Sequence, residues 1–554
     1  MTACQKPQSE AAPIVTNNWC ISGGPIYTAL DDTPTATAIA VNNGKISYVA
    51  TDGESLDWCD KFAGRNPRNL NLDGKALYPG LTDGHAHLLG IGLREMTFNL
   101  DQVKSIKELT SALADVVAET PKGDVIYGRG WIETHWPEKR FPSRQDLDSV
   151  APDNPVILER SDGHAVVVNS LALKRSSITA ATEAPFGGAI NLDTDGQPTG
   201  MLIDNAGKLI EGLMPTLTPE RKAEAYKVGA ALYAKRGWTN IHSMSVNPDD
   251  TALITSLAKK GDIKIRVYNS IDLLDGRSMP KMTRKTIETD ARITTRAIKL
   301  YADGALGSRG AALLAPYSDD PKNSGLMTLK KDTALPILKA ALRNGTQVNT
   351  HAIGDKANQQ VLDWYAQAMA EVPATERPFK EPRWRIEHSQ ILSLDDINRF
   401  KSLGVIPSMQ PSHAIGDLHF AVDRLGKQRL KGGYAWKSLI ESGTVIIGGS
   451  DAPVEVGDPR IEYYAAVERR DQSGYNNEAW YPEERVSRQN ALKMFTAWPA
   501  YGAFQEDSLG TIEVGKEADF TIFETDIMTI DAKDILEANV ALTIVSGNVA
   551  YEAP

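Results

Sequence analysis

The residues of this chain best suited to chemistry are a few histidines and one aspartate, each placed where an apolar segment ends. The 554 residues include only nine histidines, so their positions are informative. His85 and His87 stand two apart after the first such segment, and side chains at i and i+2 point to the same face of an extended chain. His351 and His388 each end a later segment, and Asp451 follows another. Imidazole and carboxylate groups are the ligands expected for zinc or a similar divalent ion.

A structural role has to be weighed for each of these side chains. Considered singly, His351, His388 and Asp451 fit an ordinary place in a core or loop better than a metal site. Considered together, five metal-capable side chains at the same end of four strands are poorly explained by chance. The joint pattern therefore predicts a metal centre.

Lys299 is a sixth candidate, because it interrupts an apolar segment that ends at Tyr301. An unpaired ammonium group inside a barrel is costly, so a structural role would require a buried carboxylate partner. In the functional interpretation, Lys299 loses its proton in a desolvated site and reacts with CO2, and the carbamate bridges two cations. The sequence leaves both interpretations open.

Elements that position these residues follow a regular order. Short apolar segments alternate with helical stretches such as 219–236 and 332–344, the pattern of βα units. Eight such units predict a (β/α)8 TIM-like barrel of the α/β class, in which the C-terminal ends of the strands meet at one cleft. The expected strands are 76–82, 239–244, 263–269, 296–301, 346–351, 383–388, 405–409 and 444–450.

Both ends of the chain read as β structure, with a hairpin signal at Asn43-Gly44. Each end offers too few strands for an independent sheet, so we expect them to pair. The stretch between the first two barrel strands is too long for one loop. The predicted organisation is a disordered tail (1–17), a composite N-/C-terminal β-sandwich (18–75 and 505–554), a catalytic barrel (76–89 and 236–504), and a domain inserted after strand 1 (90–235) over the barrel mouth.

The composition limits the kinds of partner that this protein is expected to bind. The net charge of −11 argues against nucleic-acid binding, and no run approaches the roughly 20 apolar residues of a membrane span, so we expect no transmembrane segment. Cys4 precedes a polar run and fits a lipid anchor on an envelope protein of bacteria, which we favour over a cytoplasmic location. Cys20 and Cys59 would pair only in an oxidising compartment, and the sequence does not decide between a disulfide and two thiols.

The order HxH, Lys, His, His, Asp resembles the amidohydrolase superfamily with a binuclear centre. More closely, the chain resembles its YtcJ-like branch, which includes N-substituted formamide deformylases. The resemblance covers nearly the whole chain from about residue 18, and it is specific for the metal pattern but not for the substrate. It is carried by Asp83-Gly-His-Ala-His-Leu88, Gly128-Arg-Gly-Trp131, Arg160-Ser-Asp-Gly-His-Ala165, the run from Lys299 to Arg309, Thr350-His-Ala-Ile-Gly-Asp355, Ile386-Glu-His-Ser-Gln390 and Gly448-Gly-Ser-Asp-Ala-Pro453.

This resemblance implies a catalytic arrangement. His85, His87 and Asp451 would hold the more buried cation, and His351 and His388 the other, with carboxylated Lys299 between two Zn²⁺ ions. A metal-bridging hydroxide would attack an amide-type carbonyl, and Asp451 would carry the proton to the leaving nitrogen. The substrate would be a small molecule, and family habit suggests a homodimer.

Other polar and aromatic residues resemble family positions near the cleft. For each of them a structural role is about as well supported as substrate binding. His242, at the end of the second strand, is expected beside the metal centre rather than as a ligand. The candidate substrate contacts are Asp162, His164, Asp303, Arg309, Trp131 and Trp136.

Two other functions remain to be weighed. A mononuclear deaminase would use His85, His87, one later histidine and Asp451, but it leaves Lys299 unexplained. A non-catalytic envelope binding protein could keep the barrel, but a complete ligand set has no purpose in binding alone. The sequence favours the metal-dependent hydrolase of a carbon–nitrogen bond, and it does not identify the substrate.

Overall fold

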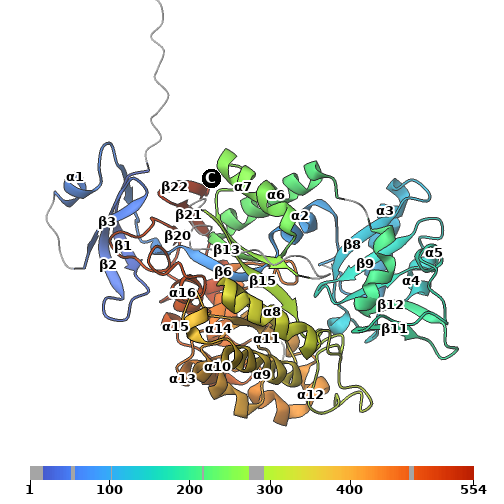
Figure 1. Ribbon diagram of the computed structural model, residues 1–554. Coiled ribbons are helices and arrows are strands. Elements are labelled where there is room, and N and C mark those ends of the chain that lie inside the picture. Colours follow the sequence, from blue (N-terminus) through green and yellow to red (C-terminus); the bar gives the residue numbers. More distant parts are fainter. Residues whose placement is uncertain are drawn as a thin grey trace, which may run out of the picture.

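The computed structural model describes residues 17–51, 57–101, 103–214, 217–273, 292–472, 474 and 479–554. These residues form a parallel barrel sheet, a mixed sheet built from both ends of the chain, and a third sheet. Figure 1 shows the barrel in the centre, most of the mixed sheet on the left and the third sheet on the right. Cys4 and almost all of the predicted tail lie outside the described residues.

The barrel sheet has eight strands in the order β19-β18-β17-β16-β15-β14-β13-β6, and all of its pairings are parallel. Its two ends nearly close, because Asp451 N–H donates to His85 O at 2.6 Å. This sheet confirms the predicted TIM-like α/β architecture. The strands are β6 (Leu81–Ala86), β13 (Trp238–Val246), β14 (Arg266–Asp272), β15 (Ile293–Tyr301), β16 (Gln347–Ala352), β17 (Arg385–His388), β18 (Ile406–Met409) and β19 (Ile447–Gly448).

Helices surround this sheet, and α6 (Pro219–Arg236) illustrates how the sequence sets their limits. The Thr218 side chain accepts a hydrogen bond from Arg221 N–H, and Gly237 ends the helix with φ 98°. The other helices of the barrel region are α2 (Leu88–Met96), α7 (Thr251–Lys260), α8 (Lys331–Asn344), α9 (Asp355–Glu371), α10 (Ile397–Leu403), α11 (Pro411–Asp417), α12 (Ala421–Arg429), α13 (Trp436–Glu441), α14 (Pro459–Glu468), α15 (Arg488–Met494) and α16 (Ala497–Gly502).

The first predicted strand, 76–82, is wrong because it consists of two strands. β5 (Ala76–Pro79) pairs antiparallel with β20 (Phe520–Phe523) in the terminal sheet, whereas β6 begins at Leu81 and runs parallel to β13. Gly80 separates them at a close crossing, where a Cβ atom would lie 2.3 Å from Thr239 Oγ1. As a result His85 lies within β6 and not beyond a strand end.

The strands of both termini form one continuous sheet around a shared apolar core. Ile21 and Ile39 from the N-terminal part pack in that core with Phe520 and Ile544 from the C-terminal part. The sheet order is β22-β21-β20-β5-β1-β2-β3, and β4 also pairs with β1. The bounds are β1 (Trp19–Tyr27), β2 (Thr35–Asn42), β3 (Lys45–Ala50), β4 (Arg68–Asn71), β21 (Val540–Val545) and β22 (Asn548–Glu552).

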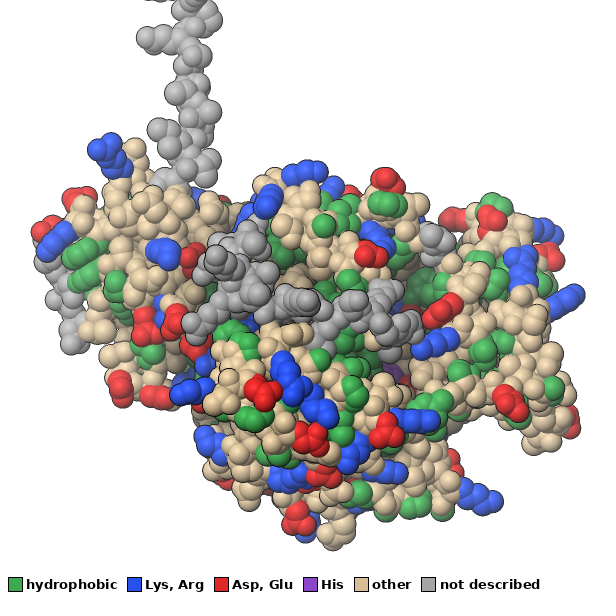
Figure 2. All heavy atoms as spheres, viewed as in Figure 1, with side chains coloured by type: hydrophobic (Ala, Val, Ile, Leu, Met, Phe, Trp, Pro, Cys, Tyr) green, Lys and Arg blue, Asp and Glu red, His purple; other side chains and the backbone are tan. Residues whose placement is uncertain are grey.

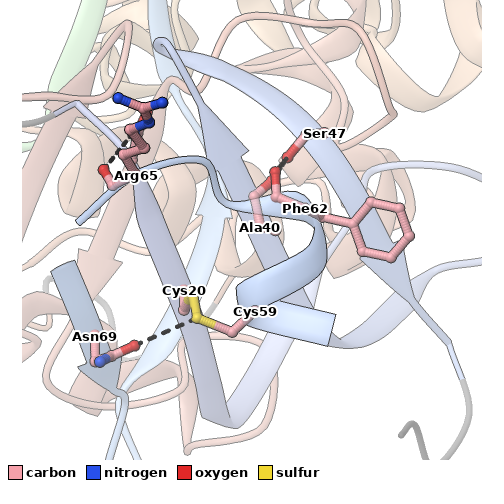
Figure 3. The surroundings of a disulfide bond; sticks show 8 residues. Cys20, Ala40, Ser47, Cys59, Phe62, Arg65 and Asn69 are labelled. Carbon is pink, nitrogen blue, oxygen red and sulfur yellow. Dashed lines mark hydrogen bonds between the residues drawn. A yellow bond between two sulfur atoms is a disulfide. The ribbon is translucent and has the colours of Figure 1, made fainter. Parts of the chain in front are cut away.

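A disulfide joins Cys20 of β1 to Cys59 of the short helix α1 (Trp58–Phe62), as Figure 3 shows. The sequence had left this pairing open. The helix is further held by the stacked rings of Tyr48 and Phe62, whose centroids lie 4.5 Å apart, and by Ser47, which donates to Phe62 O at 2.8 Å. The disulfide therefore fastens this helix to an interior strand of the terminal sheet.

The third sheet lies between the first two barrel strands in the sequence and has its own apolar core. On the face shown in Figure 2, lysine, arginine, aspartate and glutamate side chains are interspersed over the barrel helices. Among the described residues, no helix combines the length and apolarity needed to span a bilayer. The elements are β7 (Phe98–Asn99), β8 (Ile126–Trp131), β9 (Val156–Arg160), β10 (Ala165–Val168), β11 (Gly188–Leu192), β12 (Pro198–Asp204), α3 (Ile106–Glu119), α4 (Arg144–Asp148) and α5 (Ser170–Arg175).

Candidate metal centre

Five of the six predicted ligands gather at the C-terminal end of the barrel strands. Asp451 Oδ1 lies 3.0 Å from His87 Nε2 and 3.3 Å from His85 Nε2. Lys299 Nζ lies 3.4 Å from the same His85 nitrogen, and the ring centroids of His85 and His388 are 4.9 Å apart. Single ligand atoms of His85, His388 and Asp451 all lie within 4.8 Å of one another. This spacing allows them to share a divalent cation.

The sixth predicted ligand, His351, completes the group from β16. Its ring centroid lies 4.6 Å from that of His388. Its Nε2 atom is 3.4 Å from Gly304 O and 3.5 Å from a carboxylate oxygen of Asp303. These oxygens act as hydrogen-bond acceptors, so Nε2 carries the ring proton. The lone pair is then left on the other ring nitrogen, Nδ1.

Hydrogen bonds orient the ligands His85 and His388 in the same manner. His85 Nδ1 lies 2.5 Å from Glu387 Oε2, and His388 Nδ1 lies 2.8 Å from Gln410 Oε1. Burial opposes the ionisation of Glu387, but Arg385 and His85 hold the pKa of this carboxyl well below its usual range. An ionised Glu387 requires the proton on His85 Nδ1, which leaves Nε2 as the metal-binding atom. Such carboxylate–histidine pairs are a recurrent support of metal ligands.

The backbone that carries two of these ligands is unusual. His388 has φ 73° and Asp451 has φ 60°, in the left-handed region that side chains with a Cβ rarely adopt. Asp83 ties β6 to the segment before Asp451, since its carboxylate accepts hydrogen bonds from Ser450 N–H at 2.9 Å and from Tyr233 O–H at 2.9 Å. Strained residues persist only where their surroundings fix them, so the fold holds these ligands at a cost to backbone energy.

Lys299 is buried, with 1% of its surface exposed, and burial lowers the pKa of its amine to about 8. Its Nζ also lies 5.4 Å from the ring centroid of Tyr301. Among the described residues, no carboxylate forms an ion pair with Lys299. The structural interpretation of Lys299 required such a partner, so this arrangement favours a functional role.

A cavity that is partly open to solvent adjoins the cluster. Asp162 and His164 reach it from the turn between β9 and β10, and the His164 ring centroid lies 5.1 Å from that of His351. Burial opposes protonation of His164, but its hydrogen bond to Asp204 at 2.7 Å raises its pKa to about 9. Asp162 pairs with Arg160 in the same wall. The inserted sheet thus supplies part of the cavity beside the metal centre.

The other predicted substrate contacts do not line this cavity, although Asp303 lies against the ligand His351. Trp131 and Trp136 pack in the apolar core of the inserted sheet, where their ring N–H groups donate to backbone carbonyls at 2.9 and 3.0 Å. Arg309 is paired with Asp319 at 2.9 Å. Asp303 is buried and accepts three backbone N–H bonds, from Ala312, Ile353 and Gly354. These contacts give all four residues a structural position.

His242 lies within β13, buried inside the barrel and four residues before the strand ends. Arg385 Nη1 lies 2.9 Å from His242 Nδ1, and burial lowers the pKa of His242 well below its usual value. Arg385 also contacts Glu387, the carboxylate that orients His85. His242 is therefore connected to the centre through Arg385 and makes its contact behind the ligands.

Sequence reasoning missed several residues that the structure brings to the site. Glu387 and Gln410 orient ligands, and His413 and Glu455 line the cavity. Two of them had a usable signal: Glu387 precedes His388 in a quoted motif, and His413 is one of only nine histidines and follows β18. Glu455 had none, because it lies in an irregular segment after Asp451.

Comparison with known proteins places this site in a family. The model described as "Amidohydrolase family" matches residues 68–551. The chain belongs to this family. It is 30% identical over 544 residues to the putative amidohydrolase YtcJ of Bacillus subtilis (strain 168), covering 96% of this chain and 98% of that one. It is 26% identical over 534 residues to the N-substituted formamide deformylase of Arthrobacter pascens, covering 93% and 95% of the two chains.

Among solved structures, the amidohydrolase is similar to an uncharacterized metal-dependent hydrolase from Pyrococcus horikoshii OT3. The TM-score is 0.72 at 26% sequence identity, and the match covers 93% of this chain and 99% of that one. These findings confirm the resemblance to the YtcJ-like branch. They also confirm the enzyme class predicted from the sequence, an amidohydrolase acting on carbon–nitrogen bonds other than peptide bonds.

Proposed function

We propose that this amidohydrolase cleaves the amide-type C–N bond of a small molecule at a centre of two divalent cations, most simply Zn²⁺. The observation that carries this proposal is the convergence of six ligand-type side chains. In three of the histidines among them, one ring nitrogen is hydrogen-bonded to an oxygen atom. The remaining lone pairs are those that a borderline divalent ion prefers. The donor set therefore fits a metal centre.

Each side chain has a separate role in holding the centre. His85, His87 and Asp451 would hold one cation, and His351 and His388 the other. Lys299 lies next to His85 with a lowered pKa, so its neutral amine is available to react with CO2 and bind as a carbamate. When bound, the cations would supply a hydroxide nucleophile at neutral pH and polarise the substrate carbonyl.

Asp451 is the proposed proton carrier. Its Oδ1 atom faces His85 and His87, whereas its Oδ2 atom lies 3.7 Å from His413 Nε2, which lines the cavity. A carboxylate in this position accepts a proton from the attacking water and delivers it to the leaving nitrogen. Water and amide are then converted to a carboxylic acid and an amine, with no further reactant.

The relatives support an amide-type bond. The similar protein from Arthrobacter pascens is named as a deformylase of N-substituted formamides. That activity is the hydrolysis of a C–N bond next to a small acyl group. We extend the reaction type to this chain, because the ligand set determines it. We do not extend the substrate, because the cavity residues outside the ligand set select it.

The test combines metal analysis with a substrate screen. Protein prepared with Zn²⁺ is assayed for metal content and for hydrolysis of N-formyl, N-acetyl and longer N-acyl amines. We expect two ions per chain, and we expect Asp451→Asn to lower kcat by about a thousandfold while the far-UV circular dichroism stays unchanged. The exposed Asp395→Asn is the matched control and should keep full activity.

Two results would overturn the proposal. Retention of activity by Asp451→Asn would remove the proton carrier. One ion per chain, together with an active Lys299→Ala variant, would favour a mononuclear enzyme such as a deaminase.

A further inference from the structure

In the wall of the cavity, the cationic side chains are paired with carboxylates, whereas two further carboxylates lie outside these pairs. Arg160 is paired with Glu133 at 2.8 Å and also with Asp162, and His164 is paired with Asp204 at 2.7 Å. The two cationic side chains that line the cavity are thus already neutralised. Two further carboxylates in the lining, Asp417 and Glu455, belong to neither pair.

The Glu455 carboxylate is partly open to solvent, with 29% of its side chain exposed. Among the described residues, none donates a hydrogen bond to it, and the nitrogen of His413 lies 4.0 Å from Glu455 Oε1. Burial, then the neighbouring Asp417 and Asp451, raise the pKa of Glu455 to about 8. An anion with these neighbours would be stabilised by a positive charge placed in the cavity.

Asp417 strengthens the negative field from the end of α11. Its carboxylate accepts hydrogen bonds from Gln390 Nε2 at 2.6 Å and from the Tyr434 hydroxyl. Both donors are neutral, so they satisfy its hydrogen bonding but leave its charge without a counter-ion. The cavity lining therefore contains two carboxyl groups, Asp417 and Glu455, with which no lysine or arginine among the described residues forms an ion pair.

His413 is a second, independent sign that a ligand group is accommodated here. Its residue surface is 9% exposed, and its Nε2 atom is buried without a hydrogen-bond partner in the described part of the chain. The atom lies between Asp451 Oδ2 at 3.7 Å and Glu455 Oε1 at 4.0 Å. A buried polar atom left unpaired costs free energy, and a polar group of the substrate would satisfy it.

The orientation of the substrate in the cavity follows from the proposed proton carrier. Asp451 delivers its proton to the leaving nitrogen, so that nitrogen must lie next to Asp451. His413 and Glu455 follow one another on the cavity side of Asp451 Oδ2. The part of the substrate attached to the leaving nitrogen therefore extends toward Glu455, in a cavity that the apolar side chains of Leu306 and Phe420 also line.

We propose that this cavity binds the leaving amine, that the amine carries a second, cationic group, and that Glu455 is the residue that selects it. The substrate class is then a monoacylated diamine or a similar amide with a positively charged leaving group. An alkyl stem would lie against the apolar wall, and the ammonium group would meet the Glu455 and Asp417 carboxylates. This inference rests on the proposed amide hydrolysis and adds the substrate class.

A matched pair of substrates tests it directly. Monoacylated diaminobutane and the acylated pentylamine have the same length, and they differ in the ammonium group that replaces a methyl group. We expect the Zn²⁺ enzyme to favour the cationic member by about tenfold or more in kcat/KM. Glu455→Gln keeps the side-chain volume and should bring the ratio between the two substrates close to one. The exposed Glu441→Gln is the matched control and should keep the preference of the original enzyme.

The outcomes separate this inference from the function on which it rests. Hydrolysis of both substrates at equal rates, or a Glu455→Gln variant that slows both by the same factor, would overturn the inference and leave amide hydrolysis intact. Calorimetry of free diaminobutane against butylamine provides a readout without turnover. Binding of diaminobutane that is lost in Glu455→Gln, with no hydrolysis of any amide, would support the cationic cavity and contradict the proposed reaction.

Discussion

At the N-terminal end of the barrel Arg266 is buried against two carboxylates, whereas at the C-terminal end Lys299 is buried against a histidine ring. Arg266 donates to Asp519 at 2.6 Å, to Glu517 at 3.0 Å and to Ser546 at 2.6 Å. Lys299 has only imidazole and phenol rings among its described contacts. Both side chains are at most 3% exposed, so burial alone does not distinguish them.

The difference shows how the two ends of the fold are used. Arg266 joins β14 to the terminal sheet, and the hydrogen bonds of its guanidinium group repay its desolvation. At the opposite end, Lys299 and His413 are buried and Glu455 is partly buried, and each has few partners among the described residues. Groups of this kind are stabilised by a ligand rather than by the fold, which is the usual division between the two faces of such barrels.

The largest effect is expected when the two buried basic residues, Arg266 and Lys299, are each replaced by methionine. Arg266→Met leaves Asp519 without its counter-charge and Glu517 with only the more exposed Lys45 at 3.5 Å, so we expect it to lower the free energy of unfolding by about 3–5 kcal/mol. Lys299→Met removes an ammonium group that has no paired carboxylate, so we expect a change within about 1 kcal/mol in the metal-free protein. Urea denaturation in the presence of a chelator measures both. Equal losses in the two variants would contradict the distinction.

A second test separates stability from activity by cutting the disulfide. Cys20 and Cys59 are 39 residues apart, and closing a loop of this length contributes about 2–4 kcal/mol. Replacing both cysteines by serine should lower the unfolding free energy by that amount and leave kcat/KM per folded molecule unchanged. Treatment of the original protein with a reductant should reproduce the loss. An altered kcat/KM would show that the terminal sheet also shapes the metal centre.

The smallest effect concerns a buried carboxyl beneath the cavity. Glu462 on α14 accepts a hydrogen bond from Ser412 N–H at 3.0 Å, and burial raises its pKa well above the ordinary value of 4.5. The folded protein therefore keeps this proton at pH values where the unfolded chain has lost it, so stability falls as the pH rises above 4.5 toward the raised pKa.

Glu462→Gln removes this titration. We expect the variant to exceed the original protein in stability by about 1 kcal/mol at about pH 8, and the gain to vanish at about pH 4. Thermal unfolding across this range measures the difference. A gain that does not vary with pH would point to packing instead of charge.

The strand ends were readable from the sequence because short apolar segments alternate with helical stretches. His351 and His388 were placed correctly at the ends of β16 and β17, the former one residue short. Pattern reasoning failed where the backbone leaves the extended region. His388 has φ 73°, which breaks the alternation of side chains and allows both Glu387 and His388 to face the site. Without that angle, consecutive residues would point to opposite faces.

Aromatic residues near the inserted sheet illustrate a second limit. Trp131 and Trp136 stand in a family motif, but their ring N–H groups meet backbone carbonyls of the inserted sheet and its flanking loop. The amphipathic indole ring fits a pocket wall and a core equally well, so its type does not decide between them. Arg309 is similar, because its partner Asp319 follows ten residues later in an irregular segment that has no period to read.

The sequence by itself determined which side chains can bind metal, their order along the chain and the barrel that gathers them, because residue chemistry and periodicity are local properties. Only the tertiary structure decided that Lys299 has no carboxylate partner among the described residues, that Glu387 and Gln410 orient the ligands, and that Glu455 faces the cavity without a counter-charge. The physical reason is that burial and pairing are relations between distant segments. They set the free energy of a charge, and no single segment contains them.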